Sequence, residues 1–234
     1  MKILIEIHCF NRKTITEIVL NQLFNYRHGT DIQLINDHST EYDNDWLKQW
    51  GRVIKYPKKS NINVLKYRTL KNFLLTDYTH LYMCDNDAYH DPSYIDMLIK
   101  LHIQSKGLPV TLYRSSFITS FGFNVSRFVE NIPHGEIKSG LCGGISVFLS
   151  REHVVKIVES LSKTEEEWEL ICEKEAWDSK WQRVLGGKYA IPFMSYVEHY
   201  GAGGKNHKDF YSDYALNPTP YLKNTYDSIK NKLI

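Results

Sequence analysis

The sequence predicts an α/β fold with a mainly parallel central sheet and helices on both faces of that sheet. In residues 1–90, short apolar runs alternate with segments that have the 3.6-residue spacing of helices. The first run, residues 2–8, has three consecutive apolar residues, which is typical of a strand buried on both faces. Strand–helix–strand alternation favours parallel strands, because the connecting helix returns the chain to the same edge.

The elements of the first half follow in order. We expect strands at residues 2–8, 31–37, 52–56 and 80–84, the third of which is stopped by Pro57. Helices are expected between them, at residues 14–26, 46–50 and 63–76. The first of these helices has one apolar face, made of Ile15, Ile18, Val19, Leu23 and Phe24.

The second half is less regular. Asp91-Pro92 predicts the start of a helix that runs to about Ser105. Strands are expected at residues 109–115, 145–149, 189–191 and 193–198, with a loop-rich stretch at 116–137 and a glycine turn at 141–144. A further helix is expected from 150 or 151 to 161. Thr164 and Glu167 have the spacing of a capping box that starts the next helical region.

We expect a single domain at residues 1–204, because no repeat or linker interrupts it. It divides into two halves, residues 1–90 and residues 91–204. The polar, Tyr-rich residues 205–234 are expected to form either a lid or a loosely held tail.

Composition limits the classes of protein and ligand. The formal net charge is +2, so nothing points to a nucleic-acid binder. The four cysteines form no Cys-x-x-Cys pair, which argues against zinc. Three of them lie in or beside apolar runs, which favours buried thiols in a reducing compartment. No signal peptide precedes the strand at Lys2, and no apolar run is long enough to span a bilayer. We expect a cytoplasmic protein; the alternative is a place on a membrane surface, where lipid-linked acceptors are found.

The chemistry centres on Asp85-Asn86-Asp87, directly after the strand at 80–84. Carboxylates here must face a cleft, pair with cations or hold a metal ion, because a buried unpaired charge is too unfavourable. Ligands of open α/β sheets bind beside the carboxyl ends of the strands. Hard oxygen ligands at that edge suit Mg²⁺ or Mn²⁺, which suit a diphosphate. The alternative, in which these residues have no role in function, is a turn rich in Asp and Asn that leads to Asp91-Pro92.

Other segments at the same edge complete a pattern. They are the loop at 8–12, Asp37-His38-Ser39 after the second strand, the segment at 61–68, the acidic stretch at 173–178, and Val197-Glu198-His199-Tyr200-Gly201. Together with Asp85-Asn86-Asp87, this order resembles family 2 of the GT-A glycosyltransferases over residues 2–204. The chain departs from that family at Arg68-Thr69, where the family has an Arg-Asn pair.

The resemblance implies a nucleotide-diphosphate sugar as donor, a glycan, lipid-linked or protein-linked acceptor, and Mn²⁺ or Mg²⁺ as cofactor. The residues that it assigns to nucleotide binding are Phe10, Asn11, Arg12, Asp37, Lys66, Arg68, Asp85 and Asn86. Those assigned to the metal are Asp87, Asp85 and His199. The catalytic base of an inverting reaction is Asp178, with Glu175 as second choice, and the acceptor site includes Gly143, Gly144 and Trp177.

Two other functions stay open. A nucleotidyltransferase also uses an α/β sheet with acidic residues, but it normally has a glycine-rich basic loop near the first strand, and residues 8–12 contain no glycine. A non-catalytic module that binds sugars or nucleotides is the alternative outside enzymes.

Overall fold

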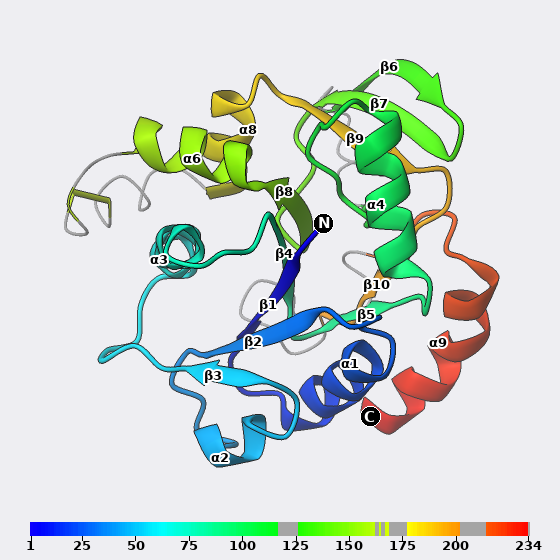
Figure 1. Ribbon diagram of the computed structural model, residues 1–234. Helices are drawn as coiled ribbons and strands as arrows, with labels where there is room; N and C mark the ends of the chain where they lie inside the picture. The colour runs from blue at the N-terminus through cyan, green and yellow to red at the C-terminus, as the bar shows by residue number, and fades with distance from the viewer. Residues whose placement is uncertain (117–125, 162–163, 165–166, 169–176, 202–213, 234) are drawn as a thin grey trace.

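A five-stranded sheet lies at the centre of the computed structural model, which describes residues 1–116, 126–161, 164, 167–168, 177–201 and 214–233 (Figure 1). The order of its strands is β3-β2-β1-β4-β8. Their bounds are β1 Ile3–Cys9, β2 Asp31–Asn36, β3 Arg52–Ile54, β4 His80–Asp85 and β8 Ser146–Ser150. The first four are parallel to their neighbours, and β8 runs antiparallel to β4. The prediction of a mainly parallel sheet is thus confirmed.

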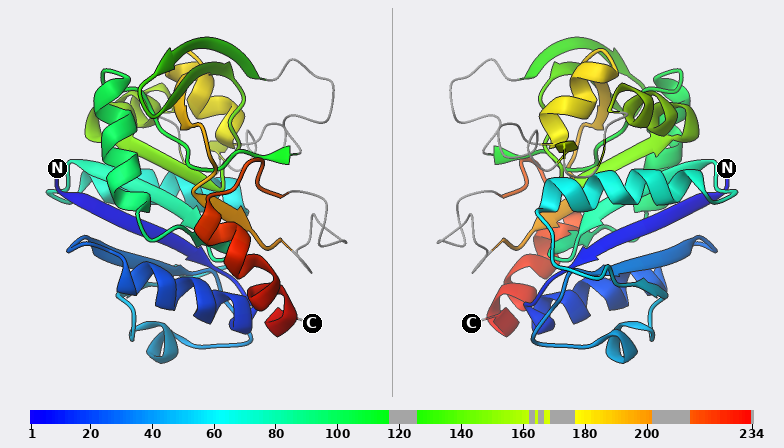
Figure 2. Two further views of the ribbon diagram at one scale, coloured as in Figure 1. Left: turned by 90° about the vertical axis from the view of Figure 1, so that its right-hand side faces the viewer. Right: turned by 90° about the vertical axis from the view of Figure 1, so that its left-hand side faces the viewer.

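Helices cover both faces of this sheet (Figures 1 and 2). Their bounds are α1 Lys13–Asn25, α2 Asn44–Leu47, α3 Ile62–Leu74, α4 Tyr94–Gln104, α6 Arg151–Ser160, α8 Trp177–Val184 and α9 Pro220–Leu233. Because successive strand residues point to opposite faces, Ile5 of β1 belongs to the hydrophobic core that includes residues of α1, α4 and α9, whereas Leu4 belongs to the core that includes residues of α3, α6 and α8. The sheet therefore separates two hydrophobic cores.

Two smaller sheets complete the described part of the fold. β5 (Ala88–His90), which follows the acidic motif, pairs antiparallel with β10 (Val197–His199). β6 (Ser126–Ile132), β7 (Gly135–Gly140) and β9 (Lys188–Pro192) form an antiparallel sheet in that order. The pairing of β5 with β10 joins the second half of the chain to the residues just after β4.

Several local predictions were wrong. The stretch at 116–137, predicted to be loop-rich, contains β6 and leads into β7, while 117–125 lie outside the described residues. The central residues of β6 are exposed, so the strand has no alternating pattern to reveal it and depends on its pairing with β7. Residues 109–115 form isolated bridges instead of the predicted strand, such as those from Val110 to Phe148 and Ala190.

The predicted start of one helix, α4, differs from the structure, whereas the predicted capping box at Thr164 is present. α4 begins at Tyr94, two residues after Pro92, because Asp91 Oδ1 accepts hydrogen bonds from Ser93 and forms a turn first. The capping box at Thr164 is confirmed: Thr164 Oγ1 accepts from the Glu167 amide at 3.2 Å, and Glu167 Oε2 accepts from the Thr164 amide at 3.1 Å.

The last described segment, 214–233, contains a helix that is docked on the protein. α9 lies beside α1 (Figures 1 and 2), and its Leu222 and Ile229 are buried in the core. The ring of Tyr221 stacks on that of Tyr89, with 6.2 Å between their centroids. This part of the predicted tail is therefore held by side-chain packing.

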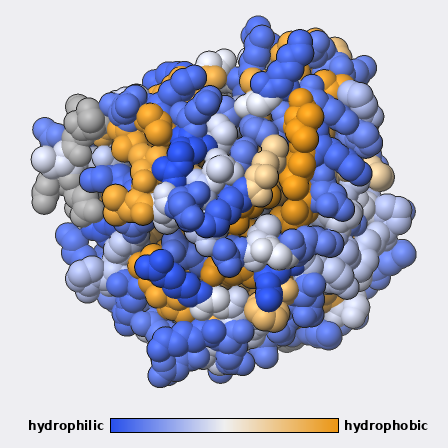
Figure 3. Space-filling view, viewed as in Figure 1, coloured by the Kyte–Doolittle hydropathy of each residue, from blue (hydrophilic) through white to orange (hydrophobic). Residues whose placement is uncertain are grey.

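The face seen in Figure 1 is mainly hydrophilic, and its hydrophobic side chains form several separate groups (Figure 3). Among the described residues, no helix is long and apolar enough to cross a membrane.

The docking of α9 can be tested with Leu222→Ala. Leu222 is 1% exposed, and removal of a buried leucine side chain is expected to lower the free energy of unfolding by about 3 kcal/mol. Urea denaturation measures this value, with Lys223→Ala at the neighbouring exposed position as the control. An equally small effect of both variants would contradict the docked position of α9.

Candidate functional site

The predicted site residues gather at one edge of the central sheet because of strand direction. β1, β2 and β4 are parallel, so the loops that follow Cys9, Asn36 and Asp85 emerge at the same edge. β8 is antiparallel and begins there, which brings the preceding glycine turn, 141–144, to that edge as well. Sequence positions more than a hundred residues apart thus meet around Asp85-Asn86-Asp87.

Asp87 is the most enclosed carboxylate of this edge. Its side chain is 3% exposed, and its Oδ2 accepts a hydrogen bond from Arg12 Nη1 at 2.6 Å. His199 Nε2, on β10, lies 3.0 Å from the same oxygen. Burial alone raises the pKa of Asp87, but the charges and hydrogen bonds of His199 and Arg12 outweigh it and hold the pKa well below its usual range. Asp87 is therefore ionised at neutral pH.

Asn86 turns inward and braces the same contact. Its side-chain oxygen accepts from Arg12 Nη2 at 3.2 Å, and its amide nitrogen donates to Thr16 Oγ1 at 2.6 Å. The side chain is buried. The resemblance assigned Asn86 to nucleotide binding, whereas the structure places its polar atoms against α1 and Arg12.

Two consecutive non-glycine residues after β1 have left-handed backbones, Asn11 with a φ of 48° and Arg12 with a φ of 57°. Each such conformation costs about 1–3 kcal/mol unless the surroundings hold it. Here Asn11 Oδ1 accepts from the Thr40 amide at 2.8 Å and from Ser39 Oγ at 3.1 Å. The loop after β2 thereby fixes the turn that aims Arg12 at Asp87.

Asp85 pairs with a buried lysine. Lys66 of α3 is 1% exposed, and its Nζ lies 3.0 Å from Asp85 Oδ1, while about a third of the Asp85 side chain (32%) is exposed. A lysine so enclosed needs a carboxylate partner to keep its charge. Asp85 is therefore paired with Lys66, whereas Arg68, which the resemblance assigned to nucleotide binding, donates to Ser60 Oγ at 2.5 Å.

The predicted base, Asp178, lies near these residues at the start of α8. The Trp177 amide donates to Asn63 Oδ1 at 3.1 Å, which attaches α8 to the beginning of α3. Lys66 Nζ lies 5.5 Å from the centroid of the Trp177 ring. Partial burial raises the pKa of Asp178, and the nearby charge of Asp85 raises it further, against hydrogen bonds from the Ser179 amide and its own amide. Glu175, the second choice, lies outside the described residues.

Gly143 and Gly144, which the resemblance assigned to the acceptor site, lie close to the start of α8. A Cβ atom added to Gly144 would lie 2.9 Å from Nε1 of Trp177, so the tryptophan ring occupies the place of a side chain there. Gly143 has a φ of 71°, a conformation that glycine adopts without strain. The glycine turn thus leaves room for the Trp177 ring at the start of α8, next to Asp178.

The residues assigned to the nucleobase and ribose lie at the outer part of the edge. Phe10 is 37% exposed, and Lys59 Nζ lies 3.4 Å from the centroid of its ring. Asp37 is partly buried, which raises the pKa of its carboxyl, and it accepts from the Ser60 amide at 3.5 Å. The sequence analysis did not include Lys59 among the site residues. The pair of adjacent lysines after the third strand, Lys58 and Lys59, was the signal that could have indicated it.

Asp85, Asp87 and His199 do not fit a divalent ion as their side chains lie. In the described ranges, no group of three or more His, Cys, Asp or Glu side chains is placed to hold a metal. Oδ2 of Asp87 faces Arg12 and His199, and Oδ1 of Asp85 faces Lys66. Asp87 Oδ1 is buried with no hydrogen-bond partner among the described residues, whereas a divalent ion takes about six oxygen ligands.

Comparisons with known proteins identify the architecture. No family model and no curated protein matches the sequence. TarS residues 1–349 from S. aureus, a GT-A glycosyltransferase, superpose with a TM-score of 0.56 at 12% identity, over 84% of this chain and 60% of that one. The chain has a GT-A-like fold.

Two further structures share this GT-A-like fold. A mannose-1-phosphate geranyltransferase from Thermus thermophilus superposes with a TM-score of 0.54 at 10% identity, over 82% of this chain and 74% of that one. CMP:2-keto-3-deoxy-manno-octonic acid synthetase, in complex with CTP, has a TM-score of 0.53 at 8% identity, over 99% of this chain and 100% of that one. The predicted fold class is confirmed.

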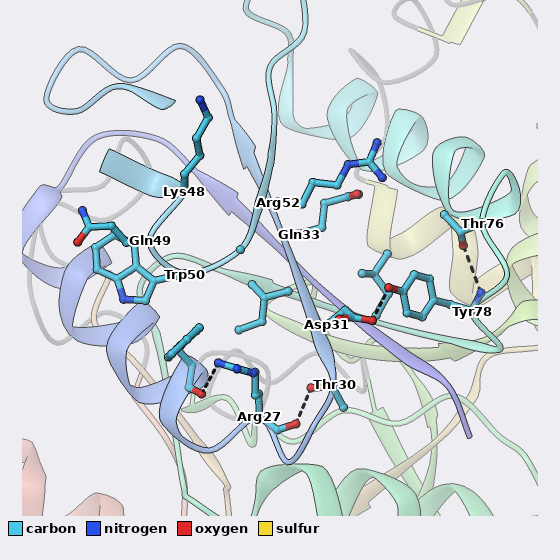
Figure 4. A pocket seen from close by; sticks show the side chains of 14 residues that line it. Arg27, Thr30, Asp31, Gln33, Lys48, Gln49, Trp50, Arg52, Thr76 and Tyr78 are labelled. Atoms are coloured by element: carbon cyan, nitrogen blue, oxygen red, sulfur yellow. Dashed lines mark hydrogen bonds between the residues drawn. The ribbon is translucent and has the colours of Figure 1, made fainter. Parts of the chain in front are cut away.

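A pocket of about 400 Å³ lies at the other edge of the sheet (Figure 4). Asp31 and Arg52, which line it, are the first residues of β2 and β3, whereas the candidate site follows the last residues of the strands. The Asp31 carboxylate accepts from the Tyr78 hydroxyl at 2.5 Å (Figure 4). This pocket is therefore separate from the candidate site.

The burial of Asp178 predicts a pH-dependent gain in stability for Asp178→Asn. The pKa of Asp178 is higher in the folded chain than in the unfolded one, so its ionised form opposes folding at neutral pH. The variant should unfold with about 1 kcal/mol more free energy at neutral pH. The gain should vanish below pH ~4, where the carboxyl is protonated in both states.

Urea denaturation across this pH range measures the difference. Asp45→Asn, at an exposed carboxylate whose pKa is lowered by its bond to Lys48, is the control and should bring no gain. A difference for Asp178→Asn that is negative at neutral pH, or the same at every pH, would contradict the burial of this carboxyl.

Proposed function

We propose that this protein is a glycosyltransferase that moves a sugar from a nucleotide-diphosphate sugar to an acceptor hydroxyl, in the synthesis of a glycan or polysaccharide. The observation that carries the proposal is the position of Asp178, a partly buried carboxyl with a raised pKa, beside the Asp85–Lys66 pair at the edge where the strand-end loops meet. The GT-A-like fold supports it, as do structures of TarS in complex with UDP-GlcNAc and with UDP.

On the donor side, Phe10 offers an exposed aromatic face to the base, and Asp37 faces the base or the ribose. Lys59, over Phe10, and Lys66, beside Asp85, bring positive charge to a bound diphosphate. Asp85 is exposed enough to accept from a ribose hydroxyl while it stays paired with Lys66. The chain lacks the Arg-Asn pair of the resembled family, and Lys66 supplies the positive charge in its place. Lys66 lies on the buried face of α3, one helical turn before Leu70.

On the acceptor side, Asp178 acts as the general base. Its raised pKa makes it a better proton acceptor than an exposed aspartate. The acceptor oxygen attacks the anomeric carbon and its proton passes to Asp178, while the bond from that carbon to the diphosphate oxygen breaks and its electron pair leaves with the nucleoside diphosphate. Direct displacement of this kind inverts the anomeric centre and needs no covalent enzyme intermediate.

A nucleotidyltransferase is the second candidate, because one structural neighbour is a synthetase in complex with CTP that superposes over 99% of this chain. The loop after β1 argues against it. Residues 8–12 contain no glycine, and the amides of Asn11 and Lys13 already donate to Ser39 Oγ and Glu41 Oε2, so they are not open to a triphosphate.

The glycosyltransferase proposal predicts separate losses of chemistry and of binding. A panel of nucleotide-diphosphate sugars should contain a donor that raises the melting temperature of the wild type. With that donor, Asp178→Asn should keep the thermal shift and lose transfer by about 100- to 10,000-fold, the usual contribution of a general base. Asp45→Asn, at a carboxylate that is 83% exposed and paired with Lys48, is the control and should keep both.

The competing functions give different products. Release of pyrophosphate from a nucleoside triphosphate and a sugar 1-phosphate would replace the proposal by a nucleotidyltransferase. A thermal shift without turnover on any acceptor, with Asp178→Asn indistinguishable from the wild type, would favour a binding module.

A further inference from the structure

Each carboxylate of the acidic motif already has a cationic partner from another element. Arg12 donates to Asp87 Oδ2 at 2.6 Å, and Lys66 Nζ lies 3.0 Å from Asp85 Oδ1. Two positive side chains therefore balance two carboxylates before any ligand arrives. A divalent ion at Asp87 must share the carboxylate with the guanidinium or displace it, and both are opposed by charge repulsion.

Displacement is also opposed by the way in which Arg12 is held. Its guanidinium rests on two acceptors, Asp87 Oδ2 and Asn86 Oδ1, and Asn86 is itself tied to Thr16. The left-handed backbone at Asn11 and Arg12 is kept by hydrogen bonds from the Ser39–Thr40 loop. A side chain that is fixed at both ends loses little entropy when it binds a ligand.

The guanidinium still has donors to offer. The Arg12 side chain is 26% exposed, against 3% for Asp87, so the ion pair has one face toward the solvent. Two of the five N–H donors of an arginine are used in its contacts with Asp87 and Asn86. The planar fork of a guanidinium suits phosphate oxygens, which are the groups that a nucleotide donor brings to this edge.

We propose that Arg12 is the resident cation of the donor site: its guanidinium contacts the diphosphate, Asp87 and Asn86 hold it in place, and nucleotide binding needs no divalent metal ion. This inference rests on the proposed function. Asp87 is then a positioning residue that acts through Arg12, and not a metal ligand.

The first experiment measures binding by the full chain without turnover. Isothermal titration with UDP, GDP, CDP and ADP is carried out once with chelator and once with Mn²⁺. A separate titration of Mn²⁺ alone follows the paramagnetic resonance signal of the free ion. We expect one nucleoside diphosphate to bind with the same affinity, within about twofold, in both solutions. The protein alone should leave the Mn²⁺ signal unchanged.

Variants then test the role of Arg12. Arg12→Gln should weaken nucleoside diphosphate binding about tenfold or more, because charge-assisted hydrogen bonds to phosphate are lost. Arg12→Lys should restore part of the affinity. Arg52→Gln, at the far edge of the sheet, is the matched control and should bind as the wild type does.

A double variant separates positioning from metal binding and protects against misfolding. Arg12→Gln leaves the buried Asp87 without its guanidinium partner, with only His199 beside it, whereas Arg12→Gln with Asp87→Asn removes both charges. If Asp87 acts through Arg12, the double variant should bind the nucleotide no more weakly than Arg12→Gln alone.

The outcomes distinguish this inference from the proposed function. Nucleotide binding that appears with Mn²⁺ and vanishes in chelator, or unchanged affinity in Arg12→Gln, overturns the role of Arg12 and leaves the glycosyltransferase proposal standing. A further loss on adding Asp87→Asn to Arg12→Gln overturns the positioning role of Asp87. No binding of any nucleoside diphosphate or nucleotide sugar in either solution overturns both proposals.

Discussion

The buried carboxylate of Asp87 is the constraint on which the described site depends. A charge with 3% exposure needs partners, and it draws them from two distant segments: Arg12 after β1 and His199 on β10. The backbone follows the same connection, because the Tyr200 amide donates to the Asp87 carbonyl at 2.9 Å and β10 pairs with β5. The end of the compact second half, at 197–200, is thereby attached to the end of the first half, at 87–90.

The polar groups at the carboxyl ends of the strands also explain the unusual composition of α3. An amphipathic helix on a sheet normally presents apolar residues, yet α3 buries Lys66, Arg68 and Thr69 along with its leucines and Phe73. The strands beneath it supply matching groups: His8 Nε2 lies 2.9 Å from Thr69 Oγ1, and Lys66 reaches Asp85. The ammonium group of Lys66 is thus buried beneath α3 with the Asp85 carboxylate as its ion-pair partner.

The sequence was sufficient where pattern and chemistry agreed. The alternation in residues 1–90 predicted β1 to β4, and the carboxyl ends of those strands gave the place of Asp85 and Asp37. It was insufficient where an element depends on a distant partner. β6 is exposed and owes its form to β7, and the contact of Arg12 with Asp87 joins positions 75 residues apart, so neither leaves a local pattern. The contact of the Asn86 side chain with Thr16 also joins distant positions, and the tripeptide alone does not indicate it.

Several local conflicts of the chain lie at this edge, and they are an argument for function. Left-handed backbones at Asn11 and Arg12, a lysine with 1% exposure, and a carboxyl whose pKa is raised by burial all oppose folding. At the opposite edge, the pocket of Figure 4 is lined by groups with ordinary partners, such as Asp31 with Tyr78 and Arg27 with the Phe24 carbonyl. A chain under selection for stability alone has no reason to keep the first set. The strain is explained if the groups that it holds, Arg12, Lys66 and Asp178, act on a ligand with a charge that changes during a reaction.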